Sequence, residues 1–152
     1  MKTQDKLLRA GLAFLLALTV SFAARADATA GLTMKDIDKT EHVMGYINQT
    51  KSRYQIPKAV LFNIIRSAKI GMTVSEIEAQ RAGSSKKDAV IYANRIKNIF
   101  LILAVGYYVE RYQIHGATAA NKAFTTGFDK TNDYLIKITL SMYRLLIEKE
   151  QK

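Results

Sequence analysis

The stretch from Ile99 to Val109 restricts the fold of this chain more than any other feature, because every residue in it is apolar, aromatic or glycine. As a helix, these eleven residues rise about 16 Å, roughly half the hydrocarbon thickness of a bilayer, which disfavours a membrane span in the mature chain. Both sides of such a helix must be covered by other elements. We therefore expect residues 86–114 to form the buried central helix of an all-α protein. A buried strand is the competing interpretation, since β-branched residues are frequent in the run.

Capping residues, glycines and the single proline predict the other helices. Thr33 and Asp36 have the spacing of a capping box, Pro57 suits a helix start, and Gly71 is expected to end the helix that Pro57 begins. Thr73 and Thr126 are further candidate caps. We expect a compact bundle of four to five helices around the central one, with the last helix antiparallel to it. The expected helices cover residues 33–53, 57–69, 73–82, 86–114, 118–126 and about 127–147.

The first 26 residues have the three zones of a cleavable signal peptide. A basic start is followed by an apolar stretch from Ala10 to Ala24, which is shorter than the roughly 20 residues needed to span a bilayer. The sequences Ala24-Arg25-Ala26 and Ala26-Asp27-Ala28 both fit the small-residue pattern of a cleavage site, so the mature chain would begin at Asp27 or Thr29. We expect a signal peptide at 1–26, a single helical domain at 27–152 and a periplasmic or secreted location. The alternative is an uncleaved membrane anchor.

Composition limits the partners and the chemistry of the mature chain. There is no cysteine, so no disulfide, lipidated cysteine or thiolate is possible. The net charge of the whole chain is +10, and removal of residues 1–26 leaves +7. This charge favours contact with anionic surfaces in the cell envelope, although a solvated basic surface explains it equally simply. We expect no nucleic-acid partner, because export separates the protein from most nucleic acid.

Few residues are candidates for catalysis. The two histidines, His42 and His115, fall in different predicted helices, so we expect no metal site and no cofactor. Asp129 and Asp133 share one helix face and could work as paired carboxylates. Glu110 follows the apolar run, where burial would raise its pKa and suit it to proton transfer. The simpler interpretation of all three is an ordinary surface or boundary carboxylate.

Tyrosines gather at the end of the apolar run and indicate a binding surface. A rigid apolar ring with a polar tip is common in protein interfaces, and it is equally common at the boundary of a helical bundle. The candidate binding residues are Tyr107, Tyr108, Glu110, Arg111 and Tyr112.

Known catalytic signatures, such as a nucleophile elbow or a phosphate-binding loop, are missing from the sequence. We therefore expect an exported, non-enzymatic helical protein that binds another macromolecule, with a protein partner in the cell envelope. An inhibitor or immunity protein, an adaptor and a subunit of an envelope secretion system all fit. One alternative is a carboxylate-dependent hydrolase acting on the cell wall or a small substrate. Another is a carrier of an apolar ligand, which requires a cavity of about 300 Å³.

Overall fold

The computed structural model describes residues 32–151, and this part of the chain is helical without a strand. The predicted signal peptide and its cleavage site lie outside the described residues. The six helices in chain order are α3 (Met34–Asp38), α4 (Thr40–Tyr54), α5 (Lys58–Arg81), α6 (Lys86–His115), α7 (Ala117–Ala123) and α8 (Phe128–Glu150).

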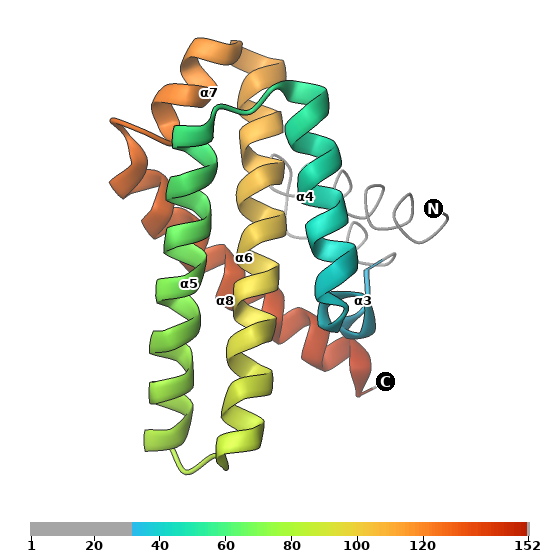
Figure 1. Cartoon of the computed structure of the whole chain (residues 1–152). Helices are drawn as coiled ribbons and strands as arrows, with labels where there is room; N and C mark the ends of the chain where they lie inside the picture. The colour runs from blue at the N-terminus through green and yellow to red at the C-terminus, as the bar shows by residue number, and fades with distance from the viewer. Residues whose placement is uncertain (1–31, 152) are drawn as a thin grey trace.

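The longest helix, α6, lies at the centre, as the apolar run predicts, and contacts all five other described helices. Figure 1 shows α5 and α4 on either side of it, α7 at the end where α6 finishes, and α8 crossing behind. The last helix, expected antiparallel to the central one, runs in the opposite sense to α6 but crosses it obliquely. This oblique crossing lets α8 cover α6 near its middle while diverging from α5.

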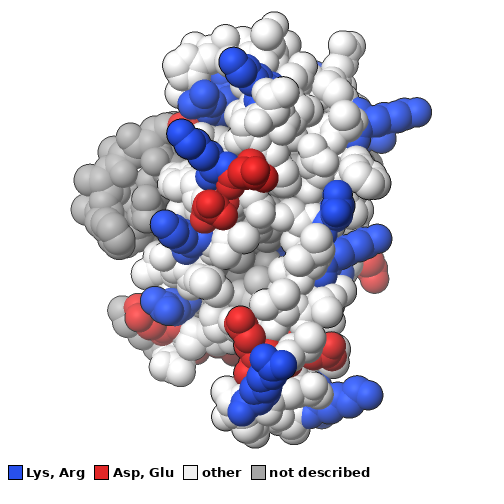
Figure 2. Space-filling view, turned by 90° about the vertical axis from the view of Figure 1, so that its left-hand side faces the viewer, with Lys and Arg blue, Asp and Glu red and all other residues white. Residues whose placement is uncertain are grey.

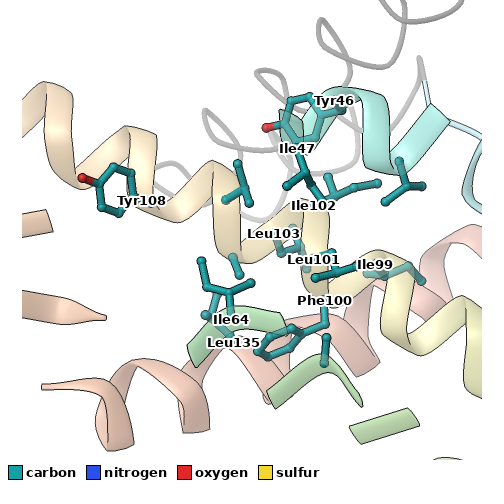
Figure 3. Close-up of a cluster of buried hydrophobic side chains, with 14 of the residues drawn as sticks. Tyr46, Ile47, Ile64, Ile99, Phe100, Leu101, Ile102, Leu103, Tyr108 and Leu135 are labelled. Atoms are coloured by element: carbon teal, nitrogen blue, oxygen red, sulfur yellow. The ribbon is translucent and has the colours of Figure 1, made fainter. Parts of the chain in front are cut away.

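The apolar run forms the core of the described structure. Every residue from Ile99 to Val109 is buried except Tyr107, which is half-buried. Figure 3 shows Phe100 on the side of α6 that faces α5 and α8, while Ile47 packs from α4 on the opposite side. Side chains thus leave α6 in several directions and are covered in each, which accounts for the missing polar stripe.

By length and hydropathy alone, α6 could also cross a membrane, and it is the one described helix for which this holds. However, 67% of its most apolar 18-residue window is buried within the chain. The interior helix of a water-soluble bundle has the same properties. The absence of a membrane span from the mature chain stays a prediction.

Local signals set the start of α3 and both ends of α6. The capping box is present: the Asp36 backbone N–H donates to Thr33 Oγ1 (3.3 Å), and the Thr33 N–H donates to Asp36 Oδ2 (3.1 Å). Helix α6 begins after Ser85, whose hydroxyl accepts from the Asp88 N–H at 3.1 Å. It ends at Gly116, whose φ of 89° favours glycine.

Several predicted helix boundaries are wrong. The single helix expected over 33–53 is divided at Lys39 into α3 and α4. Gly71 does not end a helix, because α5 continues through it to Arg81, and the two helices expected over 57–82 are one. The Thr73 hydroxyl donates to the Lys69 carbonyl (3.2 Å) within this helix instead of capping a new one. Thr126 does not cap α8 either, since that helix follows Gly127 without a side-chain cap bond.

Candidate functional site

Two of the five predicted binding residues belong largely to the interior. Tyr108 is 1% exposed, and its hydroxyl donates to Asn121 Oδ1 at 2.6 Å. The Tyr107 ring packs against Phe124 and Tyr134, with ring centroids 6.0 and 5.6 Å apart. These contacts join α6 to α7 and α8, so both tyrosines help to hold the described helices together. Tyr108 has no surface to offer a partner unless the structure opens.

The other three predicted binding residues lie at the edge of the core. Tyr112 packs edge-on against Tyr54 of α4 with centroids 5.4 Å apart, and the Arg111 guanidinium lies 5.9 Å from the Tyr107 ring centroid. Glu110 Oε2 and Arg111 Nε are buried without a hydrogen-bond partner. Burial raises the pKa of Glu110, and the nearby Arg111 offsets part of this shift. The five residues do not form one continuous surface, and their role in binding stays a prediction.

The candidate carboxylates are not brought together. Asp129 and Asp133 are exposed on α8, while Glu110 is half-buried near the end of α6. None of the three lines a described pocket. Within residues 32–151, no group of three histidine, aspartate or glutamate side chains is placed to hold a metal ion. The geometry of these acids gives the hydrolase alternative no support.

A different feature stands out as a candidate site, an apolar groove between α5 and α8 with α6 as its floor. It has a volume of about 320 Å³. We call it the α5–α8 groove. Its floor is formed by Tyr92, Ile96 and Phe100 of α6. Its walls are formed by Ser67, Ala68, Ile70, Gly71, Val74, Ser75 and Glu78 of α5, and by Asn132, Ile136, Thr139 and Leu140 of α8.

The groove exists because α5 and α8 touch at one end and separate from there. At the closed end, the Ser67 hydroxyl donates to Asn132 Oδ1 at 2.5 Å. A second bond nearby joins α5 to the chain that precedes α8, as Asn63 Nδ2 donates to the Phe124 carbonyl oxygen at 2.8 Å. Beyond this point the oblique path of α8 leads it away from α5. The side chains of α5 and α8 beyond this point are therefore too far apart to pack against each other, and the space between them is the groove.

The rims of the groove carry large aliphatic side chains exposed to solvent. Ile70 and Val74 on α5 are 54% and 46% exposed, and Ile136 and Leu140 on α8 are 43% and 37% exposed. Figure 2 shows a face of the molecule with a hollowed, largely uncharged centre. Lys and Arg side chains lie toward its margins, and Asp and Glu side chains border the centre above and below. Single exposed aliphatic residues are common on protein surfaces, but a group of them around a concavity indicates an interaction site.

Gly71 lies in the wall of the groove, ten residues before the end of α5. A Cβ added at this position would have no atom within 4 Å. Its φ is not positive, so neither the backbone conformation nor packing against the described residues requires glycine here. Glycine inside a helix costs about 1 kcal/mol relative to alanine. Its effect at this position is to widen the groove.

The groove ends in a more polar hollow of about 530 Å³ near the α5–α6 connection. Glu78 and Tyr92 line both spaces. The Tyr92 ring packs edge-on against Tyr143 of α8 (5.1 Å), and burial, together with the neighbouring Tyr143 and Glu78, raises its pKa. At the far side of the hollow, Arg95 is held by Asp38 of α3 through two hydrogen bonds of 2.9 and 3.0 Å. One end of the apolar groove thus meets a polar, charged surface.

Sequence reasoning missed this groove, although a signal for it was present. Ile70 and Val74 are four residues apart on α5, and Ile136 and Leu140 are four apart on α8, so each pair shares a helix face. Both pairs lie outside the apolar stripes that cover the core. A second apolar edge on each of two helices is the pattern that could have indicated a second contact surface.

No protein-family model matches the chain, and neither a characterised protein nor a solved structure is significantly similar to it.

Proposed function

We propose that this chain is an exported, non-enzymatic helical protein that binds a protein partner through the α5–α8 groove. The observation that carries the proposal is the apolar concavity itself, whose four rim residues are between 37% and 54% exposed. Removing apolar surface from water contributes about 25 cal/mol per Å², so a partner that covers both rims gains several kcal/mol before the costs of association.

The chemistry of the groove fits recognition better than catalysis. Its walls and floor are mainly aliphatic and aromatic, and its polar groups are hydroxyls, one amide and the Glu78 carboxylate at one end. Binding sites have this composition, with a few polar groups that fix orientation. The carboxylate-dependent hydrolase considered as an alternative needs two converging carboxylates, and the lining contains one.

The proposed location follows from the leader, whose apolar stretch and cleavage pattern predict export to the periplasm or the exterior. An inhibitor or immunity protein, an adaptor and a subunit of an envelope secretion system each act by binding a protein there. The basic charge of the mature chain would favour encounter with acidic partners or anionic surfaces. We expect no nucleic-acid partner.

Site-specific photo-crosslinking tests this proposal. A photoreactive amino acid replaces Val74 in the groove wall or, as a matched control, Val90, an exposed valine of α6 outside the groove. The protein is produced in its own cell and irradiated there. We expect one covalent protein adduct of constant mass from position 74 and none from position 90. The adduct should disappear in Gly71→Leu, which fills the groove where there is free space.

The crosslinking result can also contradict the proposal. An absence of any protein adduct at position 74 removes the protein partner, and equal adducts at positions 74 and 90 remove the groove as its site. The Gly71→Leu variant must keep the helical circular dichroism and cooperative unfolding of the wild type for its loss of crosslinking to count.

A second candidate function is the carriage of an apolar ligand, because the groove volume of about 320 Å³ meets the size that a carrier needs. The groove lies at the surface between three helices, whereas the sequence led us to expect a cavity inside the bundle. Native mass spectrometry of the purified protein separates the two functions. A bound lipid-sized mass that Gly71→Leu abolishes, without a protein adduct at Val74, would favour the carrier.

A further inference from the structure

We infer that the occupant of the α5–α8 groove is an amphipathic α-helix of the partner, with acidic residues beside its apolar stripe. This inference rests on the proposed function and specifies the chemistry of the partner. Three features of the described residues lead to it: the dimensions of the groove, the small residues in one wall, and the charges outside the rims.

The groove has the length and the pattern of contacts that a helix needs. From Ser67 to Glu78 it follows twelve residues of α5, which rise about 16 Å or three turns at 1.5 Å per residue. Along it, Ile70 and Val74 form one ridge, and Ile136 and Leu140 form another on α8. Side chains at i, i+3, i+4 and i+7 of a docking helix fit between ridges of four-residue spacing.

Small side chains in the α5 wall allow the backbone of another helix to approach closely. Ser67, Gly71 and Ser75 follow each other one turn apart and all line the groove. Helix axes approach to about 8 Å only where such small residues lie at the contact. Above them, Ile70 and Val74 remain exposed at the rim, so the groove lies open at the surface. An open groove suits a helix lying along it better than an alkyl chain, which is usually enclosed.

Positive charges predominate just outside the rims. Arg66 lies one helical turn before Ile70, Lys137 follows Ile136, and Arg144 lies one turn after Leu140; all three charged residues are exposed. Asp129 and Asp133 are exposed acids on the same face of α8, toward the closed end of the groove. Glu78 is the last residue of the α5 wall and lies where the groove meets the polar hollow. Acidic residues beside the apolar stripe of a partner helix would complement these charges, and basic ones would be repelled.

A displayed peptide library tests this inference directly, because the peptides themselves stand in for the partner helix. The library holds 20-residue helices with a fixed Leu stripe at i, i+3, i+4 and i+7, and with flanking positions drawn from Asp, Glu, Lys, Arg and Ser. Peptides are selected on the wild-type protein and counter-selected on Gly71→Leu. We expect Asp and Glu to be enriched at the flanks. Enrichment of basic flanks, or no enrichment over Gly71→Leu, overturns the inference.

A charge-reversed variant provides the matched control. In Arg66→Glu/Lys137→Glu/Arg144→Glu the groove is unchanged and only its margins differ. The enriched acidic peptide should bind this variant about tenfold more weakly at 50 mM salt, and the difference should shrink at 0.5 M salt. Equal affinity at both salt concentrations overturns the electrostatic part of the inference.

The two proposals fail separately. If Val74 crosslinks to a protein in cells while the library yields no acid-flanked helix, the groove still binds a partner, and only the helix inference falls. If neither experiment succeeds and the purified protein takes up palmitate in a way that Gly71→Leu blocks, both proposals fall in favour of the carrier.

Discussion

Replacing Gly71 by alanine should stabilise this protein, although the change lies in the wall of the proposed binding site. Gly71 is inside α5, and a Cβ there would meet no atom within 4 Å. Alanine lowers the entropy of the unfolded chain and favours the helix, and no contact is lost in return. The expected gain in unfolding free energy is about 0.8–1 kcal/mol.

The corresponding change in melting temperature follows from the size of the folded chain. With an unfolding entropy of about 2.1 cal/mol/K per residue, a folded chain of roughly 120 residues has a total near 0.25 kcal/mol/K. A gain of 1 kcal/mol then raises Tm by about 4 °C. Urea unfolding followed by circular dichroism at 222 nm should show a higher midpoint with an unchanged slope.

Another glycine of the same chain serves as the opposite control. Gly116, between α6 and α7, has φ 89° and ψ 173°, a conformation that is almost restricted to glycine. Gly116→Ala should therefore destabilise the protein by about 1–3 kcal/mol, even though its Cβ also meets nothing within 4 Å. If Gly71→Ala is neutral or destabilising while Gly116→Ala behaves as expected, our explanation of Gly71 as a space-making residue is refuted.

Three further predictions concern polar groups of α6. Burial raises the pKa of Glu110, so the folded state holds the Glu110 proton more tightly than the unfolded state does. The protonated carboxyl therefore contributes to stability at a pH below the ordinary pKa of glutamate. This contribution is lost as the pH rises through the raised pKa of the folded state. The stability of Glu110→Gln relative to wild type should therefore increase with pH across this range in urea titrations, and a pH-independent difference would contradict this. In the wild type, Asn98 Nδ2 donates to the Ile37 carbonyl oxygen at 2.8 Å. Asn98→Ala removes this donor and should lower the free energy of unfolding, measured with a chemical denaturant, by about 1–3 kcal/mol. Tyr108→Phe should cost about 1 kcal/mol through loss of the bond to Asn121, and a double-mutant cycle with Asn121→Ala should show coupling; additive effects would mean that the bond contributes nothing.

The central helix shows how far local pattern determines this structure. The run from Ile99 to Val109 requires cover on all sides, and the structure places α6 in contact with every other described helix. The capping box at Thr33 is where the sequence predicts a helix start, and α6 ends at His115, one residue beyond the predicted end at 114. These features depend on neighbouring residues alone, so the amino-acid pattern is enough to predict them.

Gly71 and the tyrosines show where local pattern was insufficient. Glycine is a common helix end, but packing of α5 against α6 outweighs the cost of one glycine, so the helix continues. The sequence also indicated tyrosines at a boundary without distinguishing Tyr108, which is buried, from Tyr112, which is 36% exposed. That difference depends on Phe124 and Asn121, which reach Tyr108 through tertiary packing.

By itself, the sequence determined the helical class, the central position of residues 86–114 and several helix ends, because hydrophobic period and capping act within a few residues of chain. The tertiary structure alone decided that α5 and α8 meet at Ser67 and Asn132 and then diverge. That crossing leaves Ile70 and Leu140 exposed at the rims of a groove. The crossing of two helices depends on how all the side chains between them pack together, and no single segment of the chain contains this information.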